Sequence, residues 1–190
     1  RSFTFTIDRG TYNDTQMSNA AGAALQRQIR EVVVPEIDKY RFGKICDGAK
    51  TTVTGKVTKA NAYDAFLTGA TTLIENNVPL VGSCAFVSSD FYKNIKEDSS
   101  FIRNGDMSQE ILIKGQVGTI DGIPLIVVPK SYFPENVEFI ITNQAATTSP
   151  VKLSEYKIHD NPPGINGWLV EGRVYYDAFV LENKKSAIYV

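Results

Sequence analysis

The sequence predicts a mixed α+β fold, and three observations lead to this prediction. First, the stretch from Asp14 to Tyr40 places apolar residues three or four positions apart, which is the period of an amphipathic helix. Second, about eight other segments have the β-branched composition or the period-two alternation of strands. Third, these strand segments do not alternate regularly with helices, which argues against a doubly wound α/β fold.

Composition limits the class of protein before any motif is considered. The chain has 190 residues, of which 43% are hydrophobic and 22% charged, as in an ordinary globular protein of one domain or two small ones. Its formal net charge of −1 argues against a dedicated nucleic-acid or membrane-surface binder. The longest apolar-rich stretch, Ile120 to Pro129, is too short for a transmembrane helix and contains Asp121.

The first segment, Ser2 to Asp8, predicts a strand because Phe3, Phe5 and Ile7 alternate with polar residues. The residues after it, from Arg9 to Asp14, predict a turn. Because the chain begins with Arg1 rather than Met, we expect that an N-terminal piece has been cut off. The hairpin partner of the strand would be lost with it, which leaves an unpaired edge or a loose arm.

The long helical pattern begins after Asn13 or Asp14, either of which can cap its first turn. Its apolar stripe includes Ala21, Leu25 and Ile29. The pattern is unusually long compared with the mean helix of about 11–12 residues. Pro35 is expected to kink the helix or to end it near Val34, because proline lacks the N–H that the helix needs.

The remaining segments follow in chain order. The first half predicts an extended segment, a helix capped by Asn61, a buried strand, a short helix and an irregular stretch, at 49–58, 62–76, 78–88, 90–96 and 97–106. Asp121-Gly122 predicts the tight turn of a hairpin within 111–128, and the prolines and glycine of 161–164 predict another turn. Strands are expected at 137–142, 151–158, 168–181 and 186–190.

No set of residues predicts catalysis, a cofactor or a metal. Cys46 and Cys84 form no CxxC pair and are expected to be buried thiols in a reducing cytosol. The single histidine, His159, excludes a multi-histidine metal site and is expected on an exposed loop. The stretch from Gly82 to Ala85 lacks the second glycine of a nucleophile elbow, and Lys114 precedes its glycines, unlike a phosphate-binding loop.

Three stretches of the sequence resemble major capsid proteins of tailed bacteriophages. The first runs from Phe3-Thr4-Phe5-Thr6-Ile7-Asp8-Arg9 into a long helix ending Val32-Val33-Val34-Pro35-Glu36-Ile37-Asp38-Lys39-Tyr40-Arg41. The second is Gly118-Thr119-Ile120-Asp121-Gly122-Ile123-Pro124-Leu125-Ile126-Val127-Val128-Pro129. The third is Val170-Glu171-Gly172-Arg173-Val174-Tyr175-Tyr176-Asp177-Ala178-Phe179-Val180-Leu181, followed by Lys184-Lys185-Ser186-Ala187-Ile188-Tyr189. The resemblance lies in the order of these stretches and covers essentially the whole chain.

The resemblance implies the capsid fold first seen in phage Hong Kong 97, with a long spine helix, a peripheral domain and an axial domain. Residues 1–13 would be the remainder of an extended loop, 14–44 with 151–190 the peripheral domain, and 45–150 the axial domain. The N-terminal arm and the first strand of the extended loop would be missing. Some family members cross-link through a lysine of that loop, but residues 1–10 contain no Lys, so no cross-link is expected.

The function that the resemblance implies is structural and not enzymatic, with no cofactor and no metal. The protein would assemble with itself into the hexamers and pentamers of an icosahedral shell around a DNA genome. Its partners would be scaffolding and portal proteins and the packaged DNA, which it would bind non-specifically. It would not bind a membrane. It would be found in the virion after assembly in the cytoplasm of the bacterial host. Assembly contacts are expected from Phe3, Phe5, Ile7 and Arg9.

Two alternatives remain open from the sequence. One is an encapsulin-like shell protein of a bacterial nanocompartment, which would share the same fold. The other, from a different class, is a small α+β enzyme or ligand-binding domain, which requires a concave pocket with convergent polar groups.

Overall fold

The computed structural model describes residues 1–14, 20–98 and 116–190. These residues form two compact units, each built from two stretches of the chain. The first unit contains Arg1–Asp38 and Ser149–Asp177, and the second contains Lys39–Thr148 and Ala178–Val190. The predicted grouping of all of 151–190 with the long helix therefore differs from the structure, which places 178–190 in the second unit.

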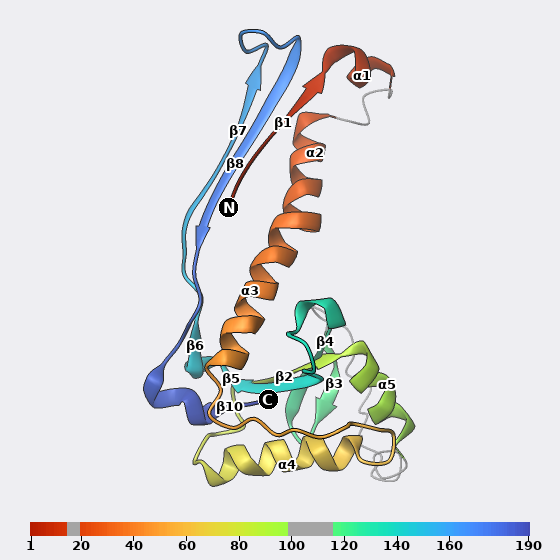
Figure 1. Ribbon diagram of the computed structural model, residues 1–190, viewed down its shortest axis with the longest axis vertical. Coiled ribbons are helices and arrows are strands. Elements are labelled where there is room, and N and C mark those ends of the chain that lie inside the picture. The colour runs from red at the N-terminus through yellow and green to blue at the C-terminus, as the bar shows by residue number, and fades with distance from the viewer. Residues whose placement is uncertain (15–19, 99–115) are drawn as a thin grey trace. The chain divides into compact units, whose positions relative to one another are not determined.

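The sheet of the first unit has three antiparallel strands in the order β1-β8-β7 (Figure 1). These strands are β1 (Ser2–Asp8), β7 (Val151–Asp160) and β8 (Gly167–Tyr176). The expectation that the first strand would be unpaired is wrong, because β1 pairs with β8 along its whole length, from Ser2 opposite Arg173 to Asp8 opposite Gly167. Alternation along the sequence identified the strand, but it carries no information about a partner strand that begins only at Gly167.

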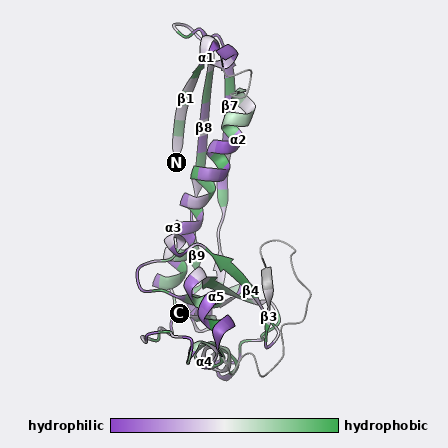
Figure 2. Cartoon of the chain, turned by 90° about the vertical axis from the view of Figure 1, so that its right-hand side faces the viewer, coloured by the Kyte–Doolittle hydropathy of each residue, from purple (hydrophilic) through white to green (hydrophobic). Residues whose placement is uncertain are grey.

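The helical part of the first unit begins with α1 (Arg9–Asp14), where the sequence predicted a turn. It continues through α2 (Ala21–Gln28), a π-helical stretch η1 (Ile29–Val33) and α3 (Val34–Asp47), which crosses the division between the units. Residues 15–19, within the predicted long helix, lie outside the described residues. α2 is green to pale over its first part and purple over its last, in keeping with its sequence AGAALQRQ (Figure 2).

Pro35 was expected to kink the helix or to end it near Val34. It does not end the helix, since α3 continues to Asp47. The π-helical turn immediately before the proline supplies a physical reason. In that turn the N–H of Val34 donates to the carbonyl of Ile29, five residues back. In a regular α-helix the ring of a proline collides with the carbonyl four residues before it. The wider π-helical turn moves that carbonyl away from the ring, so the helix can continue past Pro35.

The core of the first unit is small and joins the helix to the sheet. Val33 and Ile37, one turn apart on the helix, are buried with Val174 of β8. Phe3 and Tyr156 pack against this cluster from the two neighbouring strands. Val33 and Ile37 therefore fix the helix to the sheet, whereas Ala21, Leu25 and Ile29 of the predicted apolar stripe are only half-buried.

The second unit contains a five-stranded sheet in the order β10-β5-β2-β4-β3 (Figure 1). Its strands are β2 (Ser83–Ser88), β3 (Gln116–Ile120), β4 (Ile123–Val128), β5 (Phe139–Asn143) and β10 (Ile188–Tyr189). β2 and β4 are parallel, and the other pairs are antiparallel. The remaining elements are α4 (Ala62–Glu75), α5 (Ser89–Glu97), η2 (Lys130–Tyr132), η3 (Gln144–Ala146), η4 (Glu182–Ala187), and the short pair β6 (Thr147–Thr148) and β9 (Phe179–Val180).

Two apolar clusters form the core of the second unit. In one, Phe66 and Leu73 of α4 and Phe91 of α5 pack with residues of the sheet, including Ile141. In the other, Phe42 of α3 packs with residues that include Phe133 and Ile188. β4 is green in Figure 2, and every residue of β5 is buried, as expected for strands that are covered on both faces.

The two predicted turns are confirmed. Asp121 and Gly122, between β3 and β4, have φ angles of 49° and 79°, as the tight hairpin turn requires. Asn161 and Gly164, between β7 and β8, have φ angles of 44° and 83°. These turns follow from short-range chemistry, because Asn, Asp and Gly tolerate positive φ.

Other predicted boundaries are wrong. Residues 49–58, expected to be extended, belong to no strand, but they lie beside the C-terminal residues through an isolated bridge between Thr51 and Tyr189 and a hydrogen bond of 2.9 Å from the N–H of Val53 to the carbonyl of Val190. The expected strand 168–181 is divided in two, because β8 ends at Tyr176 and the short β9 follows at Phe179–Val180. Residues 182–187 adopt 3₁₀ turns, so the closing strand is limited to Ile188–Tyr189. The predicted irregular stretch 97–106 lies mostly outside the described residues.

Candidate assembly surface

The three apolar residues expected to make assembly contacts lie on one face of β1, but all three already pack within the chain. Ile7 is only 8% exposed, and Phe3 and Phe5 are half-buried. The rings of Phe3 and Phe5 are stacked with their centroids 6.3 Å apart, and Phe3 also lies 6.4 Å from the ring of Tyr156. A neighbouring molecule would therefore contact only the exposed parts of Phe3 and Phe5.

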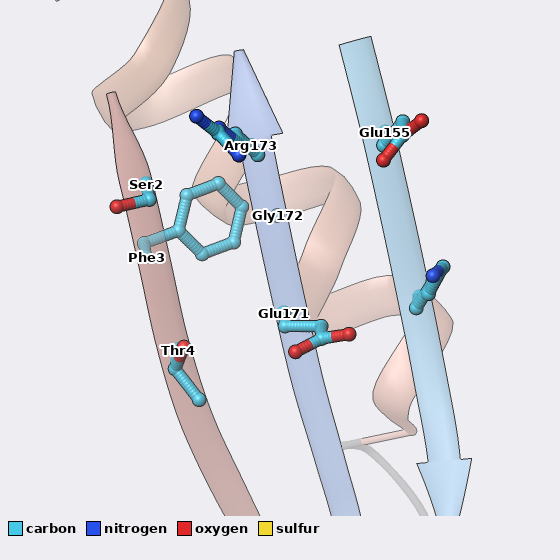
Figure 3. Close-up of a pocket in the computed structure, with 8 residues that line it drawn as sticks. Ser2, Phe3, Thr4, Glu155, Glu171, Gly172 and Arg173 are labelled. Carbon is cyan, nitrogen blue, oxygen red and sulfur yellow. The ribbon is translucent and has the colours of Figure 1, made fainter.

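Gly172 of β8 allows the ring of Phe3 to lie across the neighbouring strand (Figure 3). A Cβ atom at this position would come within 2.7 Å of Cε1 of Phe3 and 2.9 Å of Cδ1 of Tyr156. The close approach of the two rings thus depends on the absence of a side chain at Gly172.

Arg9 makes contacts within the first unit, at the start of α1. Its Nη2 donates to Oδ1 of Asn161 at 3.1 Å and to Oδ1 of Asp160 at 3.4 Å. Its guanidinium carbon lies 5.5 Å from the centroid of the Trp168 ring, and Tyr12 meets the same ring edge-on at 4.9 Å. These contacts tie the end of β1 to the turn between β7 and β8, so Arg9 has a structural role within the chain.

The opposite face of the three-stranded sheet is polar. Ser2 and Thr4 of β1 lie beside Glu171 and Arg173 of β8 and Glu155 of β7, around a shallow hollow of about 230 Å³ (Figure 3). Oppositely charged residues face one another across the strands, with Glu155 paired to Arg173 in the register. The alternation of polar and apolar residues in each strand predicted such a face, although not which charges would meet.

His159 lies on this face, within β7 rather than on the loop that the sequence predicted. Its Nε2 is 2.9 Å from Oε1 of Glu171, and both side chains are 44% exposed. The hydrogen bond with His159 holds the pKa of the Glu171 carboxyl below its usual value. Asp160, the next residue, points to the other face and meets Arg9. The single histidine is thus held in a contact with a surface carboxylate.

A groove of about 500 Å³ lies between β1 and the α2–η1 part of the helix. Phe5 and Ile7 of β1 and Ala24 and Val32 of the helix give it an apolar lining, and Val32 is 37% exposed. Charged and polar residues line the rest of the groove, namely Thr6, Asp8, Thr11, Arg27, Gln28 and Glu31. Sequence reasoning did not find this groove, because it depends on how far the helix stands from the strand.

Neither cysteine is suited to act as a nucleophile. Burial, and to a smaller extent the charge of Asp47, raises the pKa of the Cys46 thiol to about 11. Burial alone raises the pKa of the Cys84 thiol. The reactive form of cysteine is the thiolate, and it is scarce at neutral pH when the pKa is raised.

The residues that the structure describes contain no group of His, Cys, Asp or Glu side chains that could hold a metal ion. No helix among them has the length and apolar character needed to cross a membrane.

Comparison with known proteins gives matches in structure alone. No family model matches the chain, and no curated protein does. A structure from Mycobacterium phage Che8 is 14% identical with a TM-score of 0.71, over 100% of this chain and 68% of that chain. The capsid structure of cyanophage P-SCSP1u is 13% identical with a TM-score of 0.71, over 100% of this chain and 70% of that chain.

A third match is the virus-like particle from Pyrococcus furiosus. It is 11% identical with a TM-score of 0.61, over 99% of this chain and 74% of that chain. At these identities the likeness establishes the fold. The chain has the α+β capsid fold, and the predicted fold class is confirmed.

Proposed function

We propose that the protein is a structural shell protein, namely the major capsid protein of a tailed bacteriophage. The observation that carries this proposal is the match of the whole chain, at a TM-score of 0.71, to a phage capsid structure. The protein would act by self-association and not by catalysis. The raised pKa values of Cys46 and Cys84 support this reading, because they remove the two strongest candidate nucleophiles.

In this proposal the first unit corresponds to the peripheral domain and the second to the axial domain. Axial domains would surround the five-fold and six-fold axes of the shell through heterologous contacts that close into rings. Scaffolding and portal proteins and the packaged DNA would be further partners. The shell would be assembled in the host cytoplasm and found in the phage head.

Particle assembly provides the direct test. The purified chain is concentrated, and its products are examined by negative-stain electron microscopy and analytical ultracentrifugation. Rings of five or six copies, or closed isometric shells, are expected. A protein that stays monomeric at every concentration and is stabilised in a thermal-shift screen by a metal or nucleotide would contradict the proposal and favour a ligand-binding domain.

A nanocompartment shell is the second candidate, because the virus-like particle from Pyrococcus furiosus has a TM-score of 0.61 to this chain. The two candidates differ in what the shell encloses. Particles from the native source that contain double-stranded DNA would support the phage capsid. Particles that contain a single protein species and no genome would support the nanocompartment.

A further inference from the structure

The loop between α4 and β2, residues 77–82, presents an almost fully exposed apolar side chain. Val81 in this Val81 loop is 89% exposed, more than any other large hydrophobic residue that the structure describes. Ile74, near the end of the preceding helix, is 53% exposed. Single apolar residues are common on protein surfaces, so exposure alone assigns no role to the loop.

The Val81 loop is held firmly in spite of its exposure. Asn143, at the end of β5, is 7% exposed, and its Nδ2 donates to the carbonyl of Pro79 and to Oγ of Ser83, both at 3.1 Å. Oγ of Ser83 donates in turn to the carbonyl of Pro79 at 3.0 Å. The N–H of Gln144 donates to the carbonyl of Gly82 at 3.0 Å. A buried network of this kind makes the segment that it holds rigid.

Rigidity favours a role in binding. A segment that is already ordered loses little conformational entropy when a partner covers it, so more of the free energy of apolar burial remains for binding. An apolar side chain at the tip of such a loop is therefore prepared for insertion into a recess.

The surface that leads to the Val81 loop is poor in charge. Among the exposed residues of 65–82 only Glu75 is charged, although 22% of the whole chain is charged. The hydroxyls of Thr68 and Thr71 on α4 already donate to carbonyls of their own helix, at 2.9 and 3.0 Å. Depletion of charge distinguishes the centre of a protein interface from ordinary surface.

A groove of about 290 Å³ lies elsewhere on the second unit. Its walls include residues of 52–57 and 135–139. Val53, Val57 and Val137 contribute apolar side chains to it, and Val53 is 57% exposed.

β5 connects this groove to the Val81 loop. Phe139, its first residue, lines the groove, whereas Asn143, its last, binds the loop. Every residue of β5 is buried, and the strand is paired with β2 on one side and β10 on the other. The loop and the groove therefore lie at opposite ends of one firmly held strand, which at about 3.3 Å per residue spans roughly 13 Å.

We propose that the Val81 loop of one copy of this chain inserts into the groove of the next copy. Val81 would lie against Val53 and Val57 of its neighbour and remove these apolar side chains from water. Glu135 and Glu138, which also line the groove, would meet no like charge, because residues 77–82 carry none.

A second copy is the fitting occupant because each chain offers both halves of the contact. The halves lie at opposite ends of β5, so the contact is heterologous and can repeat from copy to copy. Contacts of this kind generate a ring when the rotation closes. The inference rests on the proposed function, whose rings of second units need a head-to-tail contact, and it assigns particular residues to that contact.

A charge at the tip of the loop tests the insertion. Val81→Asp would bring a carboxylate into an apolar groove that Glu135 and Glu138 already line, and burial of an unpaired charge is unfavourable. Val81→Ile is the matched control, because it keeps an apolar side chain at the same position. Association of each full chain is followed by sedimentation velocity over a range of concentrations, and circular dichroism melting shows whether each variant is folded.

The unchanged chain and Val81→Ile are expected to form rings over the same range of concentrations. Val81→Asp is expected to require a concentration at least about tenfold higher for half-assembly, which corresponds to about 1.4 kcal/mol. If the unchanged chain stays monomeric, or if folded Val81→Asp assembles as readily as Val81→Ile, the contact does not exist.

Cross-linking tests which surfaces meet. In a background with Cys46 and Cys84 replaced by alanine, Val81→Cys and Val53→Cys are introduced into separate chains, which are mixed and treated with a short bismaleimide. The mixture is expected to give a linked dimer, and neither chain alone is. A chain that carries both cysteines is expected to give a ladder of linked copies. A dimer formed by Val81→Cys alone would show an isologous contact and overturn the proposal.

The two proposals can fail separately. Shells that form without the cross-link between positions 81 and 53 would leave the shell function standing and contradict the loop contact. A cross-linked ladder from a protein that forms no closed ring or shell at any concentration would support the contact and contradict the shell function.

Discussion

Oδ2 of Asp98 accepts a hydrogen bond of 3.1 Å from the backbone N–H of Tyr63, and so joins the end of α5 to the first turn of α4. Asp98 is 2% exposed, although aspartate is rarely buried without partners. The first N–H groups of a helix have no partner within the helix, and a carboxylate there also interacts favourably with the helix dipole. The sequence indicated Asn61 as the cap of this helix. In the structure the Oδ1 of Asn61 accepts instead from the N–H of Thr58 at 2.7 Å.

Replacement of Asp98 should therefore destabilise the second unit. Asp98→Ala is expected to lower the free energy of unfolding by about 1–3 kcal/mol, because it removes the acceptor of a partly buried N–H. Asp98→Asn keeps an acceptor oxygen and should cost less. Urea denaturation followed by circular dichroism measures both. Asp64→Ala, in the same turn but exposed, is the control and should change stability by only a few tenths of a kcal/mol. Equal effects at the two positions would contradict the role of Asp98.

Gly172 gives a second prediction, concerning how β1 is held against β8. Gly172→Ala places a Cβ against the rings of Phe3 and Tyr156, which must then shift. A loss of about 1–3 kcal/mol is expected, as for other overpacked sites. The amide of Phe3 should also exchange faster with solvent. Gly22→Ala in α2 is the control with the opposite sign, because a Cβ there meets no atom within 4 Å and alanine favours the helix.

A double-mutant cycle tests the cause of the Gly172 effect. If the clash is with Phe3, the combination of Gly172→Ala with Phe3→Ala should cost less than the sum of the two single changes. Additive losses would mean that Phe3 is not the residue displaced.

Local chemistry explains which parts of the fold were predictable. The hairpin turn at Asp121-Gly122 and the strand at Ser2–Asp8 follow from neighbouring residues alone. The passage of the helix through Pro35 does not, because the π-helical turn that permits it is stabilised by the packing of Val33 and Ile37 against β8. Local patterns also do not reveal which strand pairs with β1, because its partner β8 lies at the opposite end of the chain.

The candidate surface was predictable only in part. Alternation placed Phe3, Phe5 and Ile7 on one face, but it did not reveal that Ile7 is buried within the chain. The role of Arg9 was missed, because its partners at Asp160, Asn161 and Trp168 come from a distant turn. The groove beside β1 depends on the placement of the helix, which no local pattern encodes.

Lys130 bridges two carboxylates in the second unit, and this arrangement predicts a pH dependence. Its Nζ lies 2.8 Å from Oδ2 of Asp90 and 3.1 Å from Oε1 of Glu138. The hydrogen bond from Lys130, followed by its charge, holds the pKa of Asp90 below its ordinary value. A lowered pKa in the folded state means that the carboxylate stabilises the fold above its unfolded pKa of about 3.9. That contribution is lost as the pH falls through the folded pKa.

Lys130→Met should therefore raise the pKa of Asp90 toward its ordinary value and make the acid loss of stability less steep. NMR titration of the Asp90 carboxyl carbon measures the first effect, and denaturation at several pH values measures the second. Lys93→Met is the control, because the charge of Lys93 contributes least to the lowered pKa. A pKa of Asp90 that is the same in both variants would contradict the bridge.

The two free cysteines give a prediction in which each thiol serves as the control for the other. The pKa of Cys46 is raised to about 11 by burial and by the neighbouring Asp47, whereas burial alone raises that of Cys84. At pH 8 the thiolate fraction of Cys46 in the folded protein should be about a hundredfold below that of a solvent-exposed thiol with an ordinary pKa of 9.0. Asp47→Asn should increase the alkylation rate of Cys46 and leave that of Cys84 unchanged. Iodoacetamide labelling with peptide mass spectrometry measures each site, and the urea-unfolded chain gives the reference rate. Native Cys46 reacting as fast as in the unfolded chain would show that burial does not protect it. An equal response of both thiols to Asp47→Asn would show that the charge of Asp47 is not what distinguishes them.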